Sequence, residues 1–426
     1  MAIPNRPKIL FVTRYLPALN GGGTQQRAQT ILEALAAIGD VHVFLHDFDT
    51  DPEAPVTLDA PFRPWVKTVC RAATLGNALG LWKSQVTPSL VAKALRLAWV
   101  TTGRLNPATP AQNKAIVDGI RAQTQIRQFD IVFALQAHCA MLVTDALGDL
   151  LSPEGTSILD WDAAEAIAIR ESTRQLPFWQ SPLRHFQGWW NAVKLRPLEA
   201  RLLRSWDAAL CASPIDVEYF KSRTSGKAVY CLANAVSIPP PAAAGKDFRQ
   251  SSAPQVVFVA SLNYWPNHQG AMLFLNEIWP QVRSALPNAA VRFVGRGPAA
   301  ELVACNGRDG IDVVGEVDSV APYYGAADVA IAPMIFSVGS AIKVLEALAY
   351  RKPLVGFDVS TSRHGLKDGE HVVVARTPQA FAEKLIALLN DASERERLAT
   401  KGHEYVITQF SRPRVVEGLK TFLTNL

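Results

Sequence analysis

One short segment in the second half of the chain combines residue types that could bind a nucleotide diphosphate. Gly339 and Ser340 precede a stretch with a helical pattern, and Lys343 falls in the first turn of the expected helix. Backbone N–H groups, the positive end of the helix dipole and a lysine cation would then meet at one point, which suits a diphosphate. Glu346 follows on the same helix face, where its carboxylate could accept hydrogen bonds from ribose hydroxyls. The alternative is an ordinary amphipathic helix with a lysine and a glutamate on its surface.

A glycine-rich segment near the N-terminus, LNGGGTQQR at 19–27, is a second candidate site. It follows an apolar run and opens a helical pattern, with Thr24 as the expected N-cap. Gly22 and Gly23 have no side chains to keep a ligand from the backbone, and a helix N-terminus attracts anions. The spacing matches neither the dinucleotide-binding nor the Walker A pattern. We interpret the segment as a loop that faces the donor substrate; a flexible turn is the alternative.

Both segments belong to a regular alternation of short apolar runs and helical patterns. In the first half the runs lie at 8–16, 41–47, 130–136, 156–162 and 208–214. In the second half they lie at 255–262, 289–297, 311–317, 328–334, 353–359 and 371–376. Near-continuous apolar strands separated by helices indicate parallel sheets covered on both faces. Between the halves, the segment 238–254 is rich in proline, alanine and serine and has the composition of a linker.

This pattern predicts an α/β protein with two doubly wound, Rossmann-like domains that face each other across a cleft. We place the first domain at 1–240 and the second at 241–410. Ligands of such folds bind outside the carboxyl ends of the strands, so we expect the substrates in that cleft.

The composition excludes several other classes of protein. The 426 residues are 49% hydrophobic and 19% charged, which excludes general disorder. A net charge of +5 is too weak to indicate nucleic-acid binding. We find no apolar run long enough for a spanning helix and no secretory signal pattern. The five cysteines are scattered without a Cys-x-x-Cys pair, so we expect neither a disulfide framework nor structural zinc, and a reducing cytoplasm as the location.

Basic and aromatic residues gather in the first half of the chain. The tract 61–116 contains eight basic residues and no acidic one, and the segment 174–206 mixes aromatic and basic side chains. Such segments suit an anionic membrane surface. The equal alternative is that the aromatic rings face the core while the bases are solvated.

Several motifs together resemble glycosyltransferase family 4, whose members are retaining enzymes of the GT-B fold. The family's donor-binding signature is similar to GSAIKVLEALA, followed by KPLVGFD and HGL. Further blocks precede this signature along the chain in the expected order: YLPALNGGGTQQR, SPIDVEYF, LANAVSI, LNYWPNHQGAMLF, FVGRGP and VVGEVDSVAPYYGAADVAIAP. The chain most resembles the bacterial exopolysaccharide or lipopolysaccharide type. The resemblance implies a donor bound by the second domain, an acceptor bound by the first, and a last helix, at 411–426, that crosses back to the first domain.

The resemblance implies a donor-binding role for the GSAIKVLE segment residue by residue. The glutamate that holds the donor ribose in the family falls on Glu346. The family's earlier glutamate, eight residues before, is replaced here by Val338, so the amides of Gly339 and Ser340 would have to serve instead.

Other donor contacts follow from the same resemblance. Lys343 and Arg296 are the cations nearest to the expected phosphates, and the strand that carries Gly315 and Val317 looks like the one beside the donor base. Cations and helix N-termini, with Lys343 foremost, would stabilise the leaving diphosphate, so the resemblance implies no metal and no other cofactor.

On the acceptor side, the resemblance points to His138, because related enzymes have a histidine near the transferred sugar in a comparable loop. A partly buried structural histidine is the alternative. Asp160 and Asp162 form an Asp-Trp-Asp at a strand end. We interpret them as binding acceptor hydroxyls rather than a metal, with polar residues that merely end a strand as the alternative.

We therefore expect a retaining, hexosyltransferase-like enzyme that moves a sugar from a nucleotide-diphosphate sugar to a glycan or lipid-linked acceptor in cell-surface polysaccharide synthesis. Its partners would be these substrates and an anionic membrane surface, with no nucleic acid. The expected location is cytoplasmic, with a peripheral position on the inner face of the cell membrane. The rival hypotheses are a GT-B sugar-nucleotide epimerase and a non-catalytic sugar-nucleotide-binding partner of a polysaccharide assembly complex.

Overall fold

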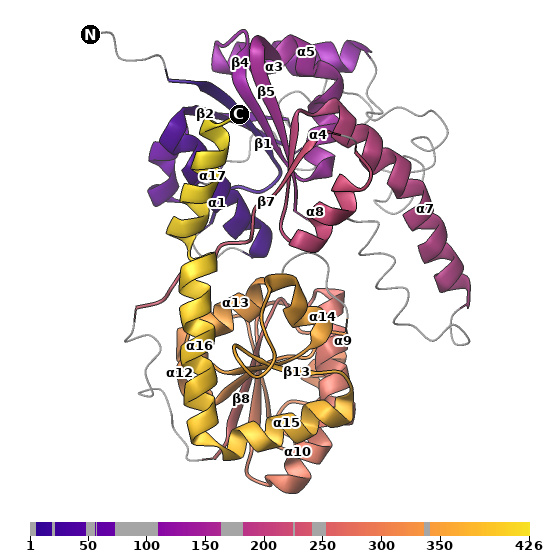
Figure 1. Cartoon of the computed structure of the whole chain (residues 1–426), viewed down its shortest axis with the longest axis vertical. Coiled ribbons are helices and arrows are strands. Elements are labelled where there is room, and N and C mark those ends of the chain that lie inside the picture. Colours follow the sequence, from indigo (N-terminus) through magenta and orange to yellow (C-terminus); the bar gives the residue numbers. More distant parts are fainter. Residues whose placement is uncertain are drawn as a thin grey trace. The chain divides into compact units, whose positions relative to one another are not determined.

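The computed structural model describes residues 6–18, 22–47, 56, 58–72, 110–162, 182–224, 226–240, 253–335 and 341–426. The chain forms two compact units, each built around its own parallel sheet (Figure 1). Unit 1 contains Met1–Thr173, Phe178–Ala233 and Val416–Leu426, and unit 2 contains Asn234–Val415. Two doubly wound α/β sheets were predicted from the sequence, and this fold class is confirmed.

The sheet of unit 1 has the strand order β3-β2-β1-β4-β5-β6-β7, with parallel pairing throughout. Its strands are β1 (Lys8–Thr13), β2 (Asp40–Leu45), β3 (Thr68–Arg71), β4 (Phe129–Leu135), β5 (Leu151–Asp162), β6 (Ala208–Cys211) and β7 (Ala228–Cys231). The order reverses between β1 and β4, so the segments that follow these two strands diverge. Ligands of doubly wound sheets bind at such a switch point.

Helices pack on the sheet of unit 1 through apolar faces. They are α1 (Gly23–Ile38), α3 (Pro110–Thr124), α4 (Ala137–Val143), α5 (Leu147–Leu150), α7 (Pro182–Ser205) and α8 (Pro214–Lys221), with short 3-10 turns η1 (Ala60–Trp65) and η3 (Thr144–Ala146). In α1, Ala28, Ile31, Leu32 and Leu35 recur at helical spacing and are fully buried. Because strand residues on both faces of the sheet are buried as well, the core of unit 1 lies in the layers between sheet and helices.

The sheet of unit 2 has the order β10-β9-β8-β11-β12-β13 and is also parallel. Its strands are β8 (Gln255–Val259), β9 (Ala290–Val294), β10 (Ile311–Gly315), β11 (Val329–Ala332), β12 (Leu354–Phe357) and β13 (Val373–Ala375). The switch point of this sheet lies between β8 and β11. Residues that follow these two strands are therefore the first candidates for a ligand site in unit 2.

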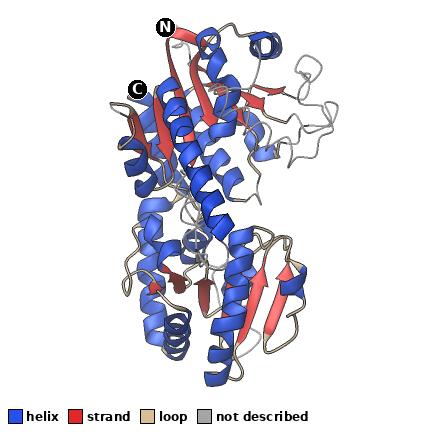
Figure 2. Ribbon diagram, turned by 90° about the vertical axis from the view of Figure 1, so that its right-hand side faces the viewer, coloured by secondary structure: helices blue, strands red, loops and turns tan. Residues whose placement is uncertain are grey.

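The helices of unit 2 cover both faces of its sheet. They are α9 (Trp265–Leu273), α10 (Trp279–Ala285), α11 (Ala300–Val303), α12 (Ala321–Ala326), α13 (Ile342–Ala349), α14 (Asp358–Thr361), α15 (Pro378–Asn390) and α16 (Ala392–Phe410), with the π-helical segment η7 (Phe274–Ile278) and the 3-10 turn η8 (Ser362–His364). The last helix, α17 (Arg412–Thr424), follows α16. Figure 1 shows α12 and α16 on one side of the strands and α9 on the other. Figure 2 shows, within each unit, strands enclosed by helices.

Two strands and one helix cap differ from the sequence-based prediction. The strands β3 and β7 were not predicted, because both are short and lie at the edges of the unit 1 sheet, where their residues are only partly buried. Thr24 was predicted to cap α1, and this is wrong. The N-cap is Gly22, whose N–H donates to the side chain of Gln25 at 3.1 Å.

The helix α17 is shared between the two units, since Val416–Leu426 belongs to unit 1 and the preceding residues belong to unit 2. Within unit 1, the Phe422 ring packs against Tyr230 of β7, with the ring centroids 4.4 Å apart. In the part of the chain that the structure describes, no helix is both long and apolar enough to cross a bilayer.

Candidate functional site

Lys343 and Asn267 meet at the switch point of the unit 2 sheet. Asn267 lies in α9, which follows β8, and Lys343 lies in the first turn of α13, which follows β11. The two strands are neighbours, so their carboxyl ends bring the two helix starts together. The Lys343 ammonium donates a hydrogen bond to Oδ1 of Asn267. The Asn267 amide donates in turn to the carbonyl of Ser261 at 2.8 Å, which fixes the orientation of this side chain.

The ammonium of Lys343 lies in a poorly hydrated position. Burial lowers the pKa of Lys343 from 10.5 to about 8, although the nearby Glu346 opposes the shift. A desolvated cation gains more from an incoming anion than a fully hydrated one, because the cost of removing its water has already been met on folding. The position of Lys343 therefore suits an anionic group such as a diphosphate.

Glu346 lies one turn further along α13 and is held by Tyr324 of α12. The Tyr324 hydroxyl donates to Oε2 of Glu346 at 3.2 Å. The Tyr324 ring is buried and stacks on Tyr350, with the centroids 4.6 Å apart. Burial raises the pKa of Glu346, and the bond from Tyr324 and the charge of Lys343 counteract this effect. The carboxylate is thus oriented and could still accept hydrogen bonds from a ligand with its other oxygen.

Two close backbone approaches shape this end of the unit 2 sheet. A Cβ on Gly270 of α9 would lie 2.9 Å from the carbonyl oxygen of Pro333, so only glycine lets α9 pack against the segment that follows β11. Gly295, with φ +139°, is closer still, because a Cβ there would lie 1.7 Å from the carbonyl oxygen of Ala260. The loops after β8, β9 and β11 are therefore held tightly against one another.

The structure places the other predicted donor-binding residues of unit 2 on the loops after β9 and β10. The carbonyl of Arg296 accepts from the N–H groups of Leu262 and Asn263, while its guanidinium is exposed and 3.9 Å from Glu316. Gly315 ends β10 with φ +79°, and Val317 follows two residues later. These assignments stay predictions. Gly339, Ser340 and Val338 lie outside the described residues.

In unit 1, Arg27 of α1 connects the glycine-rich segment to the end of β5. Its guanidinium is buried and donates to both carboxylate oxygens of Asp160, at 2.6 and 2.5 Å. A third hydrogen bond runs to the carbonyl of Leu232 at 3.0 Å. Gly22 and Gly23 stand at the start of the same helix, so Arg27 ties that start to the sheet.

The same arrangement corrects the role predicted for Asp160. Its carboxylate is fully buried and held by Arg27, so it is closed to an acceptor hydroxyl. A buried carboxylate is stable only when it is paired in this way. Asp162 lies at the end of β5 with 24% of its side chain exposed, and its Oδ1 is 3.7 Å from Nε of Arg27. The acceptor role of Asp162 remains a prediction.

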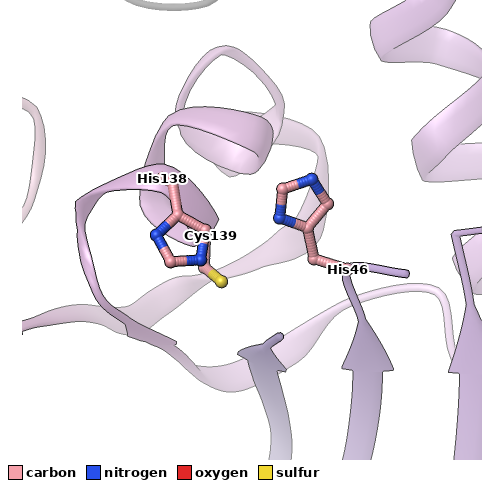
Figure 3. A group of neighbouring side chains, drawn as sticks. All are labelled: His46, His138 and Cys139. Carbon is pink, nitrogen blue, oxygen red and sulfur yellow. The ribbon is translucent and has the colours of Figure 1, made fainter. Parts of the chain in front are cut away.

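His138 lies in the first turn of α4, directly after β4 and therefore at the switch point of the unit 1 sheet. The chain turns sharply before it, because Gln136 has φ +71° and donates its N–H to the carbonyl of Asp160 at 2.7 Å. Burial, with a smaller effect from the charge of Arg14, lowers the pKa of His138 to about 4. The ring is therefore neutral near pH 7. It lies 5.6 Å from the ring of His46, which follows β2 (Figure 3).

One buried histidine and one surface hollow lie outside these candidate sites. His364 ends the turn η8 of unit 2. It is buried, its ring packs edge-on against Phe410, and burial lowers its pKa to about 4 while a backbone hydrogen bond of Ala341 opposes that shift. A hollow of about 410 Å³ in unit 1 is lined by Ser157 and Asp207 near the amino ends of β5 and β6, away from the candidate residues at the carboxyl ends.

Sequence reasoning missed Asn267, Tyr324 and Arg27. Asn267 and Tyr324 lie far from α13 in the sequence, so no local motif could reveal their contacts. For Arg27 there was a signal: it occupies the apolar face of α1, four residues before Ile31. A charged residue in an apolar stripe needs a buried partner of opposite charge.

Comparison with known proteins gives a match to a family model. The model described as "Glycosyl transferases group 1" matches residues 253–391, which lie in unit 2 and include Lys343 and Glu346. This part of the chain thus matches the group 1 glycosyl transferases, in line with the resemblance to family 4 found in the sequence. The chain is 32% identical over 169 residues to a phosphatidyl-myo-inositol mannosyltransferase of Mycobacterium leprae, and this match covers 37% of the chain and 45% of the relative. The matching part of the chain spans less than half the length of the curated relatives.

Solved structures resemble the chain over nearly its whole length. Sucrose-phosphate synthase from Thermosynechococcus elongatus is 16% identical, with a TM-score of 0.67 and 99% of each chain covered. The Anabaena protein HepE, crystallised with UDP and glucose, is 12% identical, with a TM-score of 0.61 and coverage of 99% of this chain and 100% of HepE. These likenesses show the fold, which is GT-B as the sequence predicted.

Proposed function

We propose that this chain is a retaining glycosyltransferase that moves a hexose from a nucleotide-diphosphate sugar to a glycan or lipid-linked acceptor in cell-surface polysaccharide synthesis. Unit 2 binds the donor in this proposal, and unit 1 binds the acceptor. The observation that carries the proposal is the pairing of the desolvated Lys343 ammonium with Asn267 at the switch point of the unit 2 sheet.

The donor is placed by matching its groups to the side chains around α13. Its diphosphate lies at the start of the helix, where Lys343 and the helix dipole supply positive charge. Glu346, oriented by Tyr324, accepts hydrogen bonds from the ribose hydroxyls. HepE, which shares the fold, was crystallised with UDP, so a panel of candidate donors begins with UDP-sugars.

The chemistry follows from this placement. The bond between the sugar's anomeric carbon and the diphosphate oxygen breaks, and the acceptor oxygen forms its bond on the same face of the sugar. The departing diphosphate takes the proton of the acceptor hydroxyl. Lys343 stabilises the negative charge that develops on the leaving group, which is where electrostatic catalysis has its largest effect. His138 contributes from the acceptor side as a neutral imidazole.

A lipid-linked acceptor is favoured by an aromatic cluster on α7. Phe186, Trp189 and Trp190 share one face of this helix at i, i+3 and i+4 and are 62%, 57% and 44% exposed. Their ring centroids lie 6.0–6.3 Å apart. Figure 1 shows the amino end of α7 extending away from the strands of unit 1. Exposed tryptophans suit the boundary between lipid headgroups and acyl chains, and similar chains are named as mannosyltransferases of a phosphoinositide lipid.

The first test of the proposal is a screen of donors by thermal shift, since a ligand that binds the folded state raises the melting temperature. The panel contains nucleotide-diphosphate sugars, including UDP-glucose, and their free nucleotides. Lys343→Ala should lower the affinity for the identified donor about 10- to 150-fold, equivalent to about 1.5–3 kcal/mol for a charge-assisted phosphate contact. Lys401→Ala, an exposed lysine on α16, is the matched control and should keep the affinity of the wild type.

Release of nucleotide from the donor, with and without a lipid acceptor, then separates the three hypotheses. A transferase releases nucleotide and forms a glycosylated lipid with retained anomeric configuration. An epimerase converts the donor without acceptor, and a non-catalytic partner binds it without turnover. Failure of the whole panel to bind, or equal binding by Lys343→Ala, would contradict the proposed donor site.

A further inference from the structure

Two histidines and a cysteine of unit 1 converge above the carboxyl end of β1. His46 directly follows β2, while His138 and Cys139 lie in the first turn of α4, which follows β4. One ligand atom from each residue can be chosen such that all three lie within 4.8 Å of one another. Figure 3 shows the two imidazole rings facing each other, with the sulfur of Cys139 beside the His138 ring.

The backbone around the three side chains is fixed by the sheet. The strand β1 lies between β2 and β4, so the segments after β2 and β4 flank its carboxyl end. The N–H of His46 donates to the carbonyl of Thr13 at 2.8 Å, which extends the pairing of β1 and β2 beyond the strands. On the other side, the N–H of Cys139 donates to the carbonyl of Gln136 at 3.1 Å. The backbone positions of the three residues are therefore fixed by the sheet and its flanking hydrogen bonds.

Imidazole nitrogen and thiolate sulfur are the donor atoms that zinc prefers. With Zn–N distances of about 2.0–2.1 Å and Zn–S of about 2.3 Å, two ligand atoms at a tetrahedral angle lie about 3.3–3.7 Å apart. A separation of up to 4.8 Å therefore needs to close by about 1 Å, which side-chain rotation can supply. Three protein ligands would leave the fourth position open to water or to an oxygen of a substrate.

The positive charge of Arg14 near the cluster disfavours the binding of a divalent metal ion. Arg14 is near enough to both residues of α4 for its charge to act on His138 and on Cys139. A divalent ion beside this arginine is opposed by like charge. Loss of the thiol proton to solvent on binding supplies a thiolate, so the metal and its ligands together carry one positive charge instead of two.

We propose that His46, His138 and Cys139 form a zinc site in unit 1, and that zinc bound there inhibits sugar transfer. The inhibitory effect rests on the proposed function, because the metal would withdraw the imidazole of His138 from the acceptor side. Binding of the metal itself does not depend on the proposed function. Zinc at this site would act only as an inhibitor. Such a site is compatible with the expectation that the transfer reaction itself needs no metal.

Metal binding is tested on the full chain with zinc and cobalt ions and no substrate. Titration calorimetry should give one tight zinc site per chain. Cobalt should produce a thiolate-to-metal charge-transfer band in the near ultraviolet, which requires a cysteine ligand. His46→Ala and Cys139→Ser should each weaken zinc binding about tenfold or more. Cys305→Ser is the matched control, because Cys305 is partly exposed in unit 2, and it should bind zinc as the wild type does.

Circular dichroism and the melting temperature show whether the variants fold. Because His46 is half-buried at the end of a strand, His46→Ala provides a reading even if the buried Cys139→Ser proves unstable. Zinc affinity that is unchanged in a folded His46→Ala, or cobalt binding without the charge-transfer band, would overturn the proposed site.

Activity is measured afterwards, so that the two proposals can fail separately. Zinc should inhibit transfer by the wild type, EDTA should restore it, and His46→Ala should be active with or without zinc. Tight binding through these residues with no effect on transfer would overturn the inhibitory role and leave the zinc site in place. Binding by a chain that transfers no sugar to any acceptor would support the site and contradict the proposed function.

Discussion

Arg27 of α1 and Asp160 of β5 form a two-point ion pair that is sealed inside unit 1. Both side chains are almost completely buried, and the guanidinium also reaches Asp162 and the carbonyl of Leu232. Asp160 strongly favours the charged form of Arg27, against the effect of burial. The pair joins residues 133 positions apart, so it fixes the start of α1 to the carboxyl end of the sheet.

Arg27→Ala should destabilise unit 1 by about 3–5 kcal/mol, because it leaves the buried carboxylate of Asp160 without a counter-charge. Differential scanning calorimetry should show a lower melting temperature for the transition of unit 1. The double variant Arg27→Met with Asp160→Leu should recover much of the loss, since no buried charge then remains. A single variant that melts like the wild type would contradict a structural role for the pair.

Donor binding should become coupled to proton uptake at alkaline pH through Lys343. Its pKa in the free protein is about 8, and a bound diphosphate raises it by favouring the charged form. Below about pH 7 Lys343 is already protonated and should take up no proton; near pH 9 it should take up close to one. Affinity should therefore fall as the pH rises through 8. Calorimetry in buffers of different ionisation enthalpy measures the uptake.

The same pKa also predicts how folding stability depends on pH. Between about 8 and 10.5 the unfolded chain holds the Lys343 proton and the folded chain does not. The contribution of this residue to the free energy of unfolding should therefore rise with pH across that window. In Lys343→Met, both the uptake near pH 9 and this slope should disappear; uptake that persists in the variant would assign the proton to another group.

The hydroxyl of Tyr324 should contribute to recognition of the ribose although it does not reach the donor itself. Tyr324→Phe removes the hydrogen bond to Glu346 while leaving the stack on Tyr350. The preference for the ribo- over the 2′-deoxyribonucleoside diphosphate should fall about two- to tenfold, and Glu346→Gln should lower it further. Tyr323→Phe, at the neighbouring position, is the control. If wild type shows no preference for ribose, Glu346 has another role.

The sequence was sufficient for the fold because the apolar runs of both halves are long enough to mark most strands. It was insufficient for β3 and β7, which lie at the sheet edges and contain few buried residues. For the candidate site it marked Lys343 and Glu346 through their spacing on one helix. It could not show that Asn267 and Tyr324 form hydrogen bonds with these two side chains. It also led us to predict that Asp160 binds the acceptor, because its ion-pair partner Arg27 lies 133 positions away in the sequence.

His138→Ala should lower turnover more than donor affinity, because His138 lies in unit 1 and the proposed donor residues lie in unit 2. We expect turnover to fall about tenfold or more, with the donor dissociation constant within about twofold of the wild type. Assays contain EDTA, so that metal bound by the neighbouring residues makes no contribution. Wild-type turnover from the variant would show that the histidine is structural.

The cluster of Phe186, Trp189 and Trp190 should bind membranes. Sedimentation with vesicles that contain anionic lipid should bring down the chain, and high salt should weaken binding, since each base near the surface contributes about 1 kcal/mol. Replacing the three aromatic residues by serine should reduce binding about tenfold or more. Trp265→Ser, an exposed tryptophan of unit 2, is the control. Equal binding by the triple variant would place the contact elsewhere.

The shared helix α17 has a consequence for how the protein is made. Unit 1 is not a continuous piece of chain: its closing segment Val416–Leu426 is synthesised after all of unit 2. In effect, unit 2 is inserted into unit 1. During translation unit 1 stays incomplete, with Tyr230 lacking the ring of Phe422, until residues 416–426 have left the ribosome. The second unit can fold before the first is complete, although its sequence comes later.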